Sequence, residues 1–235
     1  MRRRKLILFD IDGTLIAPGP VPRAALAEAI SQAVGEPVTL TFLDVAGQTD
    51  PTIISNALAR YRNGATHRDA DVPRILEQYL RLVEERLPQA GPVRVFPGAE
   101  ALVRACGDEN WATALLTGNV QRGARLKLAG TGLWDLFAFG VFGDDGNTRE
   151  DLPWIARERA WDTLHESFRP VDTVIIGDTP NDARIARLNG SASLIVCRRA
   201  GSEWRQAIKA EGPTWLVDGF DDVPALVNMM KGTAA

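Results

Sequence analysis

The stretch Lys5-Leu6-Ile7-Leu8-Phe9-Asp10-Ile11-Asp12-Gly13-Thr14 decides the fold, because a short apolar run ends in two carboxylates and a glycine. Such a run is typical of a buried strand, and a parallel strand leads its carboxyl end into the ligand crevice of an open α/β sheet. Because side chains alternate along a strand, Asp10 and Asp12 are expected to point the same way, with Ile11 turned into the packing. Two acids in that crevice are costly unless a cation or a reaction needs them.

The two carboxylates suit two kinds of chemistry. Mg²⁺ typically binds one or two carboxylates and takes water and phosphate oxygens at its other positions. A carboxylate can also attack phosphorus and form an aspartyl-phosphate, while a neighbouring acid carries the proton. The alternative is a strand that runs into an Asp-Gly turn, which is a common arrangement.

A second strand-like run, Ala112 to Leu116, ends in Thr117-Gly118-Asn119 just before a helical segment from Val120 to Ala129. A hydroxyl and exposed amides at a strand-to-helix junction can bind phosphate, because a helix start offers unpaired N–H groups and a positive dipole end. The same residues also fit an ordinary turn and helix cap. We therefore treat all three as candidate phosphate or substrate contacts.

A third run, Val171 to Ile176, is closed by Gly177-Asp178-Thr179-Pro180-Asn181-Asp182. With the first two runs it forms a set of motifs that resembles the haloacid dehalogenase-like superfamily of phosphatases, whose members open with DxDGT and carry GDxxxD as their fourth motif. The resemblance implies that Asp10 attacks the phosphate, and that Asp12 protonates the leaving alcohol and then activates water. It also implies a Mg²⁺ site formed by Asp10, the backbone carbonyl of Asp12 and Asp178.

Asp182 has two interpretations. The segment Thr179-Pro180-Asn181-Asp182 is a capping-box pattern with proline at the first helical position. The resemblance instead makes Asp182 a functional carboxylate that supports the metal ligands from behind, and both roles can hold at once.

The superfamily also uses a cation, usually lysine, that neutralises the phosphate and the attacking carboxylate. At the expected place, shortly before a predicted helix from Pro153 to His165, this chain has Arg149 and no nearby lysine. Arginine binds phosphate through two parallel hydrogen bonds, so Arg149 is the favoured cation and is expected, with Thr117, to hold the phosphate oxygens. Lys127, on the preceding helix, is the alternative, although its spacing predicts a solvated side chain.

Residues 18–92 change character between two proline-rich passages and carry three apolar stripes at helical spacing. The stripes predict an all-helical insert that leans on an α/β core formed by residues 1–17 and 93–235. Further strands are predicted at 139–142, 193–197 and 214–217. The predicted fold class is therefore α/β, a doubly wound parallel sheet of Rossmann-like type with an inserted helical cap domain.

A core split after its first strand by a helical insert resembles the phosphoglycolate phosphatase and β-phosphoglucomutase branch of the superfamily. In that branch the insert is a mobile cap that closes over the substrate and excludes water. The loop Gly47-Gln48-Thr49-Asp50 resembles the specificity loop of these enzymes, which makes Gln48 and Thr49 candidate substrate contacts. Asp50 can alternatively be the N-cap of a helix that starts at Pro51.

Composition narrows the function classes. The chain has 235 residues, a formal net charge of −3 and a pI near 5.5, which gives no basic footprint for nucleic acid. No segment has the apolar length of a membrane span, and the basic start is too quickly followed by Asp10 to form a signal peptide. Cys106 and Cys197 are expected to be reduced core thiols of a cytoplasmic protein.

These observations predict a Mg²⁺-dependent phosphatase that hydrolyses a small phosphorylated metabolite of the phosphoglycolate type, as a monomer or homodimer. Three alternatives stay open. A sugar phosphomutase uses the same core, a signalling module also accepts phosphate on a carboxylate, and a partner-binding protein can retain the fold after losing catalysis.

Overall fold

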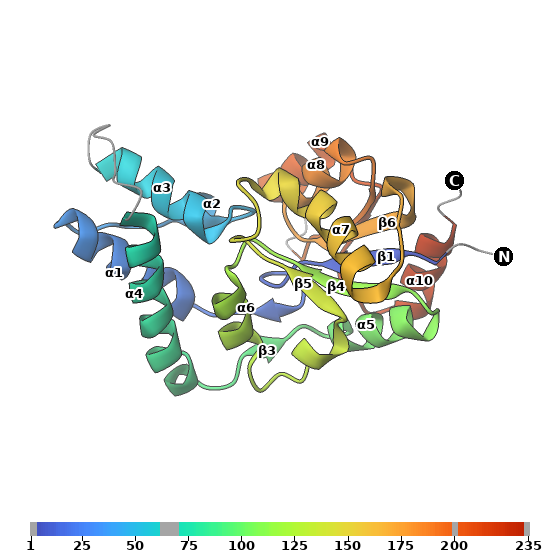
Figure 1. Cartoon of the computed structure of the whole chain (residues 1–235), viewed down its shortest axis with the longest axis horizontal. Coiled ribbons are helices and arrows are strands. Elements are labelled where there is room, and N and C mark those ends of the chain that lie inside the picture. Colours follow the sequence, from blue (N-terminus) through green and yellow to red (C-terminus); the bar gives the residue numbers. More distant parts are fainter. Residues whose placement is uncertain (1–3, 62–70, 199–201, 233–235) are drawn as a thin grey trace.

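The computed structural model describes residues 4–61, 71–198 and 202–232 (Figure 1). Within them, a six-stranded parallel sheet has the order β5-β4-β1-β6-β7-β8. The chain starts at the centre of this sheet, fills one side and then the other, so the predicted doubly wound topology is confirmed. The strands are β1 (Leu6–Phe9), β4 (Ala112–Leu116), β5 (Phe139–Val141), β6 (Thr173–Gly177), β7 (Ala192–Val196) and β8 (Trp215–Val217).

The central strands are buried on both faces, as expected for an apolar run in a parallel sheet. Along β1, Ile7 and Phe9 join the apolar cluster on one face of the sheet, whereas Leu6 and Leu8 join the cluster on the other. This alternation leaves the strand ends as the place where polar side chains can meet.

Helices cover both faces of the sheet (Figure 1). The apolar cluster with Ile7 and Phe9 includes residues of α5 (Ala99–Asp108), α6 (Gln121–Leu128) and α10 (Val223–Lys231). The opposite cluster includes residues of α7 (Leu152–Leu164) and α8 (Pro180–Leu188), and α9 (Glu203–Ala210) packs beside α8. The predicted helices at 120–129 and 153–165 are thus present, with ends shifted by about one residue.

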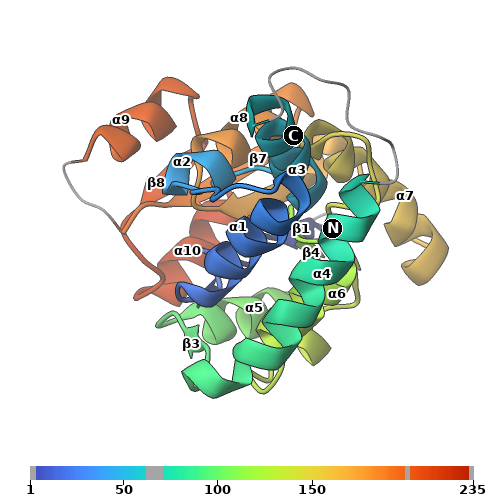
Figure 2. The ribbon, with the colours of Figure 1, turned by 90° about the vertical axis from the view of Figure 1, so that its left-hand side faces the viewer.

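The segment between β2 (Ile16–Ala17) and β3 (Arg94–Val95) is helical and has an apolar cluster of its own (Figure 2). Its long helices pack on one another, and one short helix, α2, leads into the loop at residues 46–49. The helices are α1 (Val21–Val34), α2 (Phe42–Val45), α3 (Asp50–Tyr61) and α4 (Asp71–Arg86). We call this segment the cap.

Two features of the cap connection were not predicted. Strands β2 and β3 pair antiparallel where the chain leaves the core and returns to it. Helix α2 is too short to show a periodic pattern, and a capping box between Thr41 and Asp44 defines it instead. The third predicted strand also starts later, at Thr173, because Pro170–Asp172 forms a 3₁₀ turn.

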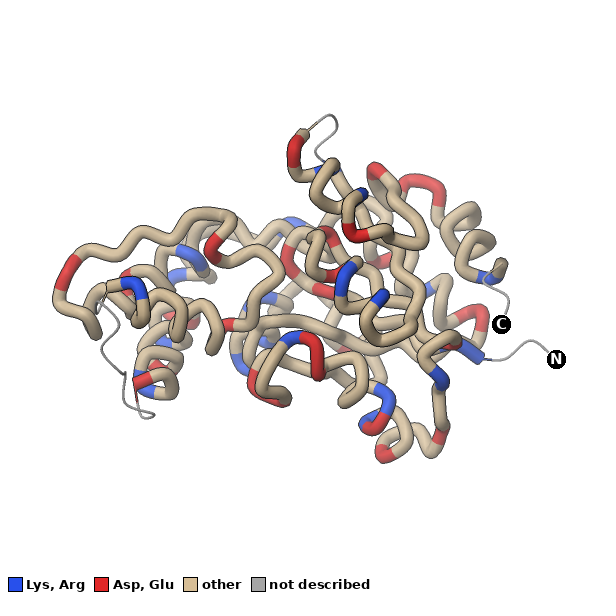
Figure 3. Tube along the Cα trace, turned by 90° about the horizontal axis from the view of Figure 1, so that it is seen from above, with Lys and Arg blue, Asp and Glu red and all other residues tan. Residues whose placement is uncertain are grey.

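Charged residues are spread over cap and core, with Lys and Arg often beside Asp and Glu (Figure 3). Several of these neighbours form surface ion pairs, such as Arg86 with Glu28 in the cap and Arg159 with Asp145 in the core. None of the helices in the described ranges is long and apolar enough to cross a membrane. Cys106 and Cys197 are both buried, as expected for core residues.

Candidate active site

A cavity of about 690 Å³ lies between the carboxyl ends of the central strands and the cap. The residues that carried the sequence motifs meet there, although they come from positions far apart in the chain. Its polar wall includes Asp10, Asp12, Gln48, Asp50, Tyr79, Thr117, Gly118, Asn119, Lys127, Arg149 and Asp178. The volume suits a small molecule.

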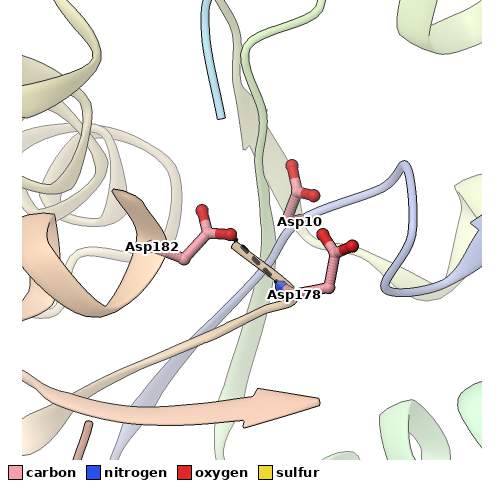
Figure 4. A group of neighbouring side chains, drawn as sticks. All are labelled: Asp10, Asp178 and Asp182. Carbon is pink, nitrogen blue, oxygen red and sulfur yellow. Dashed lines mark hydrogen bonds between the residues drawn. The ribbon is translucent and has the colours of Figure 1, made fainter. Parts of the chain in front are cut away.

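Three carboxylates form the acidic centre of the site (Figure 4). Asp10 follows β1, Asp178 follows β6 and Asp182 lies in the first turn of α8, with one oxygen of each within 4.8 Å of the others. Burial raises the pKa of Asp10 to about 7, and the carboxylates of Asp182 and Asp12 act in the same direction while Arg149 opposes them. Burial and the carboxylates of Asp10 and Asp182 also hold the pKa of Asp178 well above its usual range.

Asp182 makes the contacts that both of its predicted roles require. Its Oδ2 accepts hydrogen bonds from the backbone N–H of Asp178 at 3.2 Å, the backbone N–H of Thr179 at 3.0 Å and the Thr179 hydroxyl at 2.7 Å. The Thr179 hydroxyl accepts from the Asp182 N–H in return, which completes the capping box. The Oδ1 atom accepts from Arg149 at 2.6 Å. Because both oxygens are engaged, Asp182 fits a supporting carboxylate rather than a metal ligand.

Asp10 and Asp178 fit a hard divalent cation. Asp178 Oδ1 is buried and has no hydrogen-bond partner among the residues described. Gly13 has φ +86°, and a Cβ atom there would lie 2.1 Å from Asp178 Oδ2, so only glycine lets this carboxylate approach the end of β1. A buried carboxylate oxygen left free beside a second acid is the donor set that Mg²⁺ prefers.

Arg149 is 7% exposed and joins two of the acids. Its Nη2 atom lies 3.2 Å from Asp10 Oδ1 and 2.6 Å from Asp182 Oδ1. A capping box between Thr148 and Asp151 fixes the 3₁₀ turn that carries it. Burial alone would lower the Arg149 pKa, but the two carboxylates outweigh burial and leave the pKa raised. Arg149 therefore stays charged next to the predicted nucleophile.

The prediction that Lys127 is a solvated side chain is wrong. Lys127 is 5% exposed, and its Nζ atom lies 2.6 Å from Asp12 Oδ2 and 2.5 Å from Asn119 Oδ1. Helical spacing places Lys127 next to Leu128 on the buried side of α6, and its stem is long enough to bring the ammonium to the end of β1. Burial acts to lower the Lys127 pKa, but Asp12, with Tyr79 and Asp50, leaves it raised. The site thus contains two buried cations.

Thr117 and Asn119 lie at the end of β4, where the sequence places them. The Asn119 amide donates from Nδ2 to Asp12 Oδ2 and to Thr117 Oγ1, both at 2.8 Å. With its Oδ1 accepting from Lys127, the Asn119 side chain is committed to other side chains. Its contacts suit the orientation of Asp12 better than the substrate contact that we predicted.

The cap loop touches the core at the same place. Asp50 donates its backbone N–H to the Gly118 carbonyl at 2.8 Å, and Asn181 donates from Nδ2 to the Gly47 carbonyl at 2.6 Å. A Cβ atom on Gly118 would lie 2.0 Å from the Gln48 carbonyl oxygen and 2.8 Å from Arg149 Nη1. Gly118 is therefore required for the close approach of loop and core.

The two predicted loop contacts differ in outcome. Gln48 lines the cavity, as expected for a substrate contact, but Thr49 is absent from the wall formed by the described residues. The Thr49 side chain is buried, and its hydroxyl accepts from the Thr52 N–H at 3.2 Å, so Thr49 caps α3. The proposed N-cap role of Asp50 is also wrong, because Asp50 Oδ2 accepts instead from the Val120 N–H at 2.9 Å, before α6.

Sequence reasoning missed Tyr79 as part of the site. Tyr79 belongs to the third apolar stripe of the cap, is 1% exposed, and lines the cavity near Lys127, Asp50 and Asp12. The only signal in the sequence was a hydroxyl within an otherwise apolar stripe, and such a tyrosine is more often part of the packing.

Comparison with known proteins agrees with this geometry. A model of the haloacid dehalogenase-like hydrolase family matches residues 4–190. The chain belongs to this family. It is 32% identical to a phosphoglycolate phosphatase of Cereibacter sphaeroides over 187 residues, which cover 78% of this chain and 81% of the relative. This relationship places the chain among the phosphatases of the family.

Solved structures show the same fold. A predicted phosphoglycolate phosphatase from Haemophilus somnus has a TM-score of 0.71 at 19% identity, covering 95% of this chain and 98% of its own. A putative β-phosphoglucomutase from Bacteroides vulgatus also has a TM-score of 0.71, at 16% identity, covering 99% of this chain and 90% of its own. The fold is thus shared by proteins named as a phosphatase and as a phosphoglucomutase.

Proposed function

We propose that this protein is a Mg²⁺-dependent phosphatase that hydrolyses a small phosphorylated metabolite of the phosphoglycolate type through an aspartyl-phosphate on Asp10. One observation carries the proposal: Asp10 lies beside a buried arginine and a second acid at the end of β1, while Asp12, two residues on, lies in a separate group of contacts. Attack and proton transfer need two carboxylates with different surroundings, and these two have them.

The reaction consists of two in-line displacements at phosphorus. Asp10 attacks the phosphate monoester, the bond to the alcohol oxygen breaks, and Asp12 gives that oxygen its proton. Asp12, now a carboxylate, takes a proton from water, which attacks the aspartyl-phosphate and releases inorganic phosphate. Asp10 is regenerated as a carboxylate.

The phosphoryl oxygens need positive charge and hydrogen-bond donors in the transition state. Arg149 supplies the charge next to Asp10, and Asp182 holds the guanidinium from behind. Thr117 and Gly118, at the end of β4, line the same cavity. Asp10 and Asp178 would hold Mg²⁺, with the Asp12 backbone carbonyl, and the cation would offset the charge on the carboxylates and the phosphate.

We propose that residues 18–92 form the cap domain, and residues 1–17 with 93–235 the core. The contacts between the loop at 47–50 and the residues after β4 and β6 support a closed arrangement. Closure removes bulk water from around Asp10, which strengthens each electrostatic contact in the site. Gln48 is the cap-loop residue that we expect to contact the substrate.

The experiment is a panel of phosphorylated metabolites, including 2-phosphoglycolate and hexose phosphates, assayed for phosphate release with Mg²⁺, with Asp10→Asn as the inactive control. Release from a monoester without a bisphosphate activator supports the phosphatase. A mutase would convert one sugar phosphate into another and release little phosphate. An aspartyl-phosphate that lasts for minutes would indicate a signalling module, and absence of turnover with every ester would indicate a binding protein.

A further inference from the structure

We propose that Lys127 is a positioning residue for Asp12: together with Asn119 it fixes one carboxylate oxygen, so that the other is presented to the leaving group. This inference rests on the proposed function, because it assigns Asp12 the proton transfer. It gives the two buried cations of the site different tasks. Arg149 serves the nucleophile, and Lys127 serves the acid.

The contacts around Asp12 form a closed triangle. Asp12 Oδ2 accepts from Lys127 Nζ at 2.6 Å and from Asn119 Nδ2 at 2.8 Å, and Asn119 Oδ1 accepts from Lys127 Nζ at 2.5 Å. Each of the three side chains thus fixes the other two. Hydrogen bonds to charged groups are shorter and stronger than neutral ones, so this triangle restricts rotation of the Asp12 carboxylate.

The other oxygen of Asp12 remains available. Asp12 Oδ1 is buried and has no hydrogen-bond partner among the residues that the structure describes, although Asp12 lines the cavity. An unpartnered carboxylate oxygen is costly in a folded protein unless the ligand satisfies it. The alcohol oxygen of a phosphate ester can do so, because it receives the proton from this atom.

Arg149 has a separate set of contacts. Its guanidinium bonds Asp10 and Asp182, whereas the Lys127 ammonium bonds Asp12 and Asn119. A cation that served the phosphoryl group in place of Arg149 would be expected next to Asp10. Lys127 is instead paired with the carboxylate two residues later, on the side of the leaving group.

The cap completes the surroundings of Lys127. Helix α6, which carries Lys127, has Val120 as its N-cap, a residue whose side chain offers no acceptor for the first N–H groups of the helix. The cap residue Asp50 supplies that acceptor at Val120, and the core residue Asp144 accepts from Gln121 N–H at 3.0 Å. Tyr79 of α4 also interacts electrostatically with Lys127. Docking of the cap therefore stabilises the helix that aims Lys127.

The charge on Lys127 matters most while the proton moves. As Asp12 gives its proton to the alcohol oxygen, a carboxylate forms next to the ammonium, and their attraction grows in the transition state. This gain is large for an alkyl ester, whose alkoxide must be protonated as it leaves. It is small for p-nitrophenyl phosphate, because nitrophenolate leaves without a proton.

The test is the effect of Lys127→Met on kcat/KM for two esters, which reports the steps up to departure of the leaving group. One is p-nitrophenyl phosphate, and the other is the alkyl phosphate that the wild-type protein hydrolyses fastest. We expect a loss of about 100-fold for the alkyl ester and of less than about 10-fold for the aryl ester. Arg125→Met, which removes an exposed cation from the same helix, is the matched control and should change neither value.

Asp12→Asn provides the second comparison. In that background, Lys127→Met should not change the ratio of the two kcat/KM values further, because there is no acid left to position. Equal losses for both esters after Lys127→Met in the otherwise wild-type protein would show that Lys127 acts on the phosphoryl group. Unchanged activity toward both esters would show that Lys127 does not position Asp12. Either result overturns the inference while leaving the phosphatase intact.

A folding defect in Lys127→Met does not end the test. Asn119→Ala removes the other hydrogen bond to Asp12 Oδ2 without exposing a buried charge, and should also reduce alkyl ester turnover more than aryl ester turnover. Equal effects on both esters would contradict the triangle. If the wild-type protein hydrolyses neither ester, the proposed function itself fails.

Discussion

The two halves of the site are built differently. The charged side chains around Asp10 come from the core: Asp178 follows β6, Asp182 lies in the first turn of α8, and Arg149 lies between β5 and α7. The cap reaches this half through the Gly47 carbonyl, which accepts from Asn181. The half around Asp12 spans both parts of the molecule: Lys127 lies on a core helix whose start is capped by Asp50 from the cap. We therefore expect the position of Asp12 to depend on docking of the cap more than the position of Asp10 does.

This difference bears on how the proposed reaction is controlled. If docking of the cap completes the orientation of Asp12, departure of the alcohol is tied to the closed state. Variants around Asp10 should therefore lose similar activity toward alkyl and aryl esters, whereas variants around Asp12 should lose more activity toward alkyl esters.

The largest effect is expected at the nucleophile. Asp10→Asn should lower kcat by at least a thousandfold for alkyl and aryl esters alike, because an amide does not form an aspartyl-phosphate. The shape of the side chain is nearly kept, so circular dichroism and the thermal midpoint should stay close to those of the wild type. A folded Asp10→Asn protein with wild-type kcat would falsify the assignment.

Removal of the metal should come next. Chelation is expected to lower phosphate release by about a hundredfold or more, and Mg²⁺ should restore it whereas Ca²⁺ should suppress it, since Ca²⁺ prefers more ligands and longer bonds. A binding measurement gives an independent check: Mg²⁺ should raise the thermal midpoint of the wild type, because it binds only the folded site, and Asp178→Asn should weaken this shift. Full activity after exhaustive dialysis against a chelator would contradict the metal site.

Arg149 should have a comparable but smaller effect. Arg149→Ala is expected to reduce kcat about a hundredfold, by a similar factor for alkyl and aryl esters, because the lost charge acted on the phosphoryl group. Arg149→Lys should retain more activity than Arg149→Ala. Comparison with Lys127→Met tests most directly whether the two halves have different tasks. If Arg149→Ala lowered turnover of the alkyl ester much more than that of the aryl ester, the two halves would not have separate tasks.

The half around Asp10 could be predicted from the sequence, and the structure brings its residues together. Asp10 and Asp178 follow apolar runs that form adjacent parallel strands, and the carboxyl ends of such strands meet at one edge of the sheet. Arg149 was identified through the resemblance, which implies a cation shortly before the helix that follows. Local patterns were sufficient for Asp10 and Asp178, because each stands immediately after the strand that positions it.

The half around Asp12 could not be predicted in the same way. Lys127 lies in the last turn of α6. The position of Lys127 in the helical repeat does not reveal whether its long side chain reaches across the helix surface to Asp12. Asp50 fits the pattern of a helix cap, and it is one, but for a helix of the core that lies 70 residues later in the sequence. Such contacts depend on how the cap packs against the core, and local sequence patterns do not predict this packing.

The smallest effect is expected at Asp50, where the cap meets α6. Asp50→Ala removes the acceptor for the Val120 N–H, which should cost about 1 kcal/mol of stability and lower kcat/KM for the alkyl ester several-fold, with less effect on the aryl ester. Asp50→Asn keeps an oxygen acceptor and serves as the matched control, so it should stay closer to the wild type. Equal losses for both esters would show that docking of the cap does not act through Asp12.

Asp50 also makes a prediction about pH. Burial raises its pKa from 3.8 to about 6, with Lys127 opposing the shift. A folded-state pKa above the unfolded value means that the folded protein binds the proton more tightly, so stability is gained as the pH falls through about 6 and is fully present below 3.8. Between pH 7.5 and pH 4.5, the free energy of unfolding of the wild type, measured with denaturant, should therefore rise relative to that of Asp50→Asn by about 2 kcal/mol. A difference between the two proteins that stays constant over this range would mean that the Asp50 carboxylate is already satisfied as an anion, with the Val120 N–H and the Lys127 ammonium offsetting its burial.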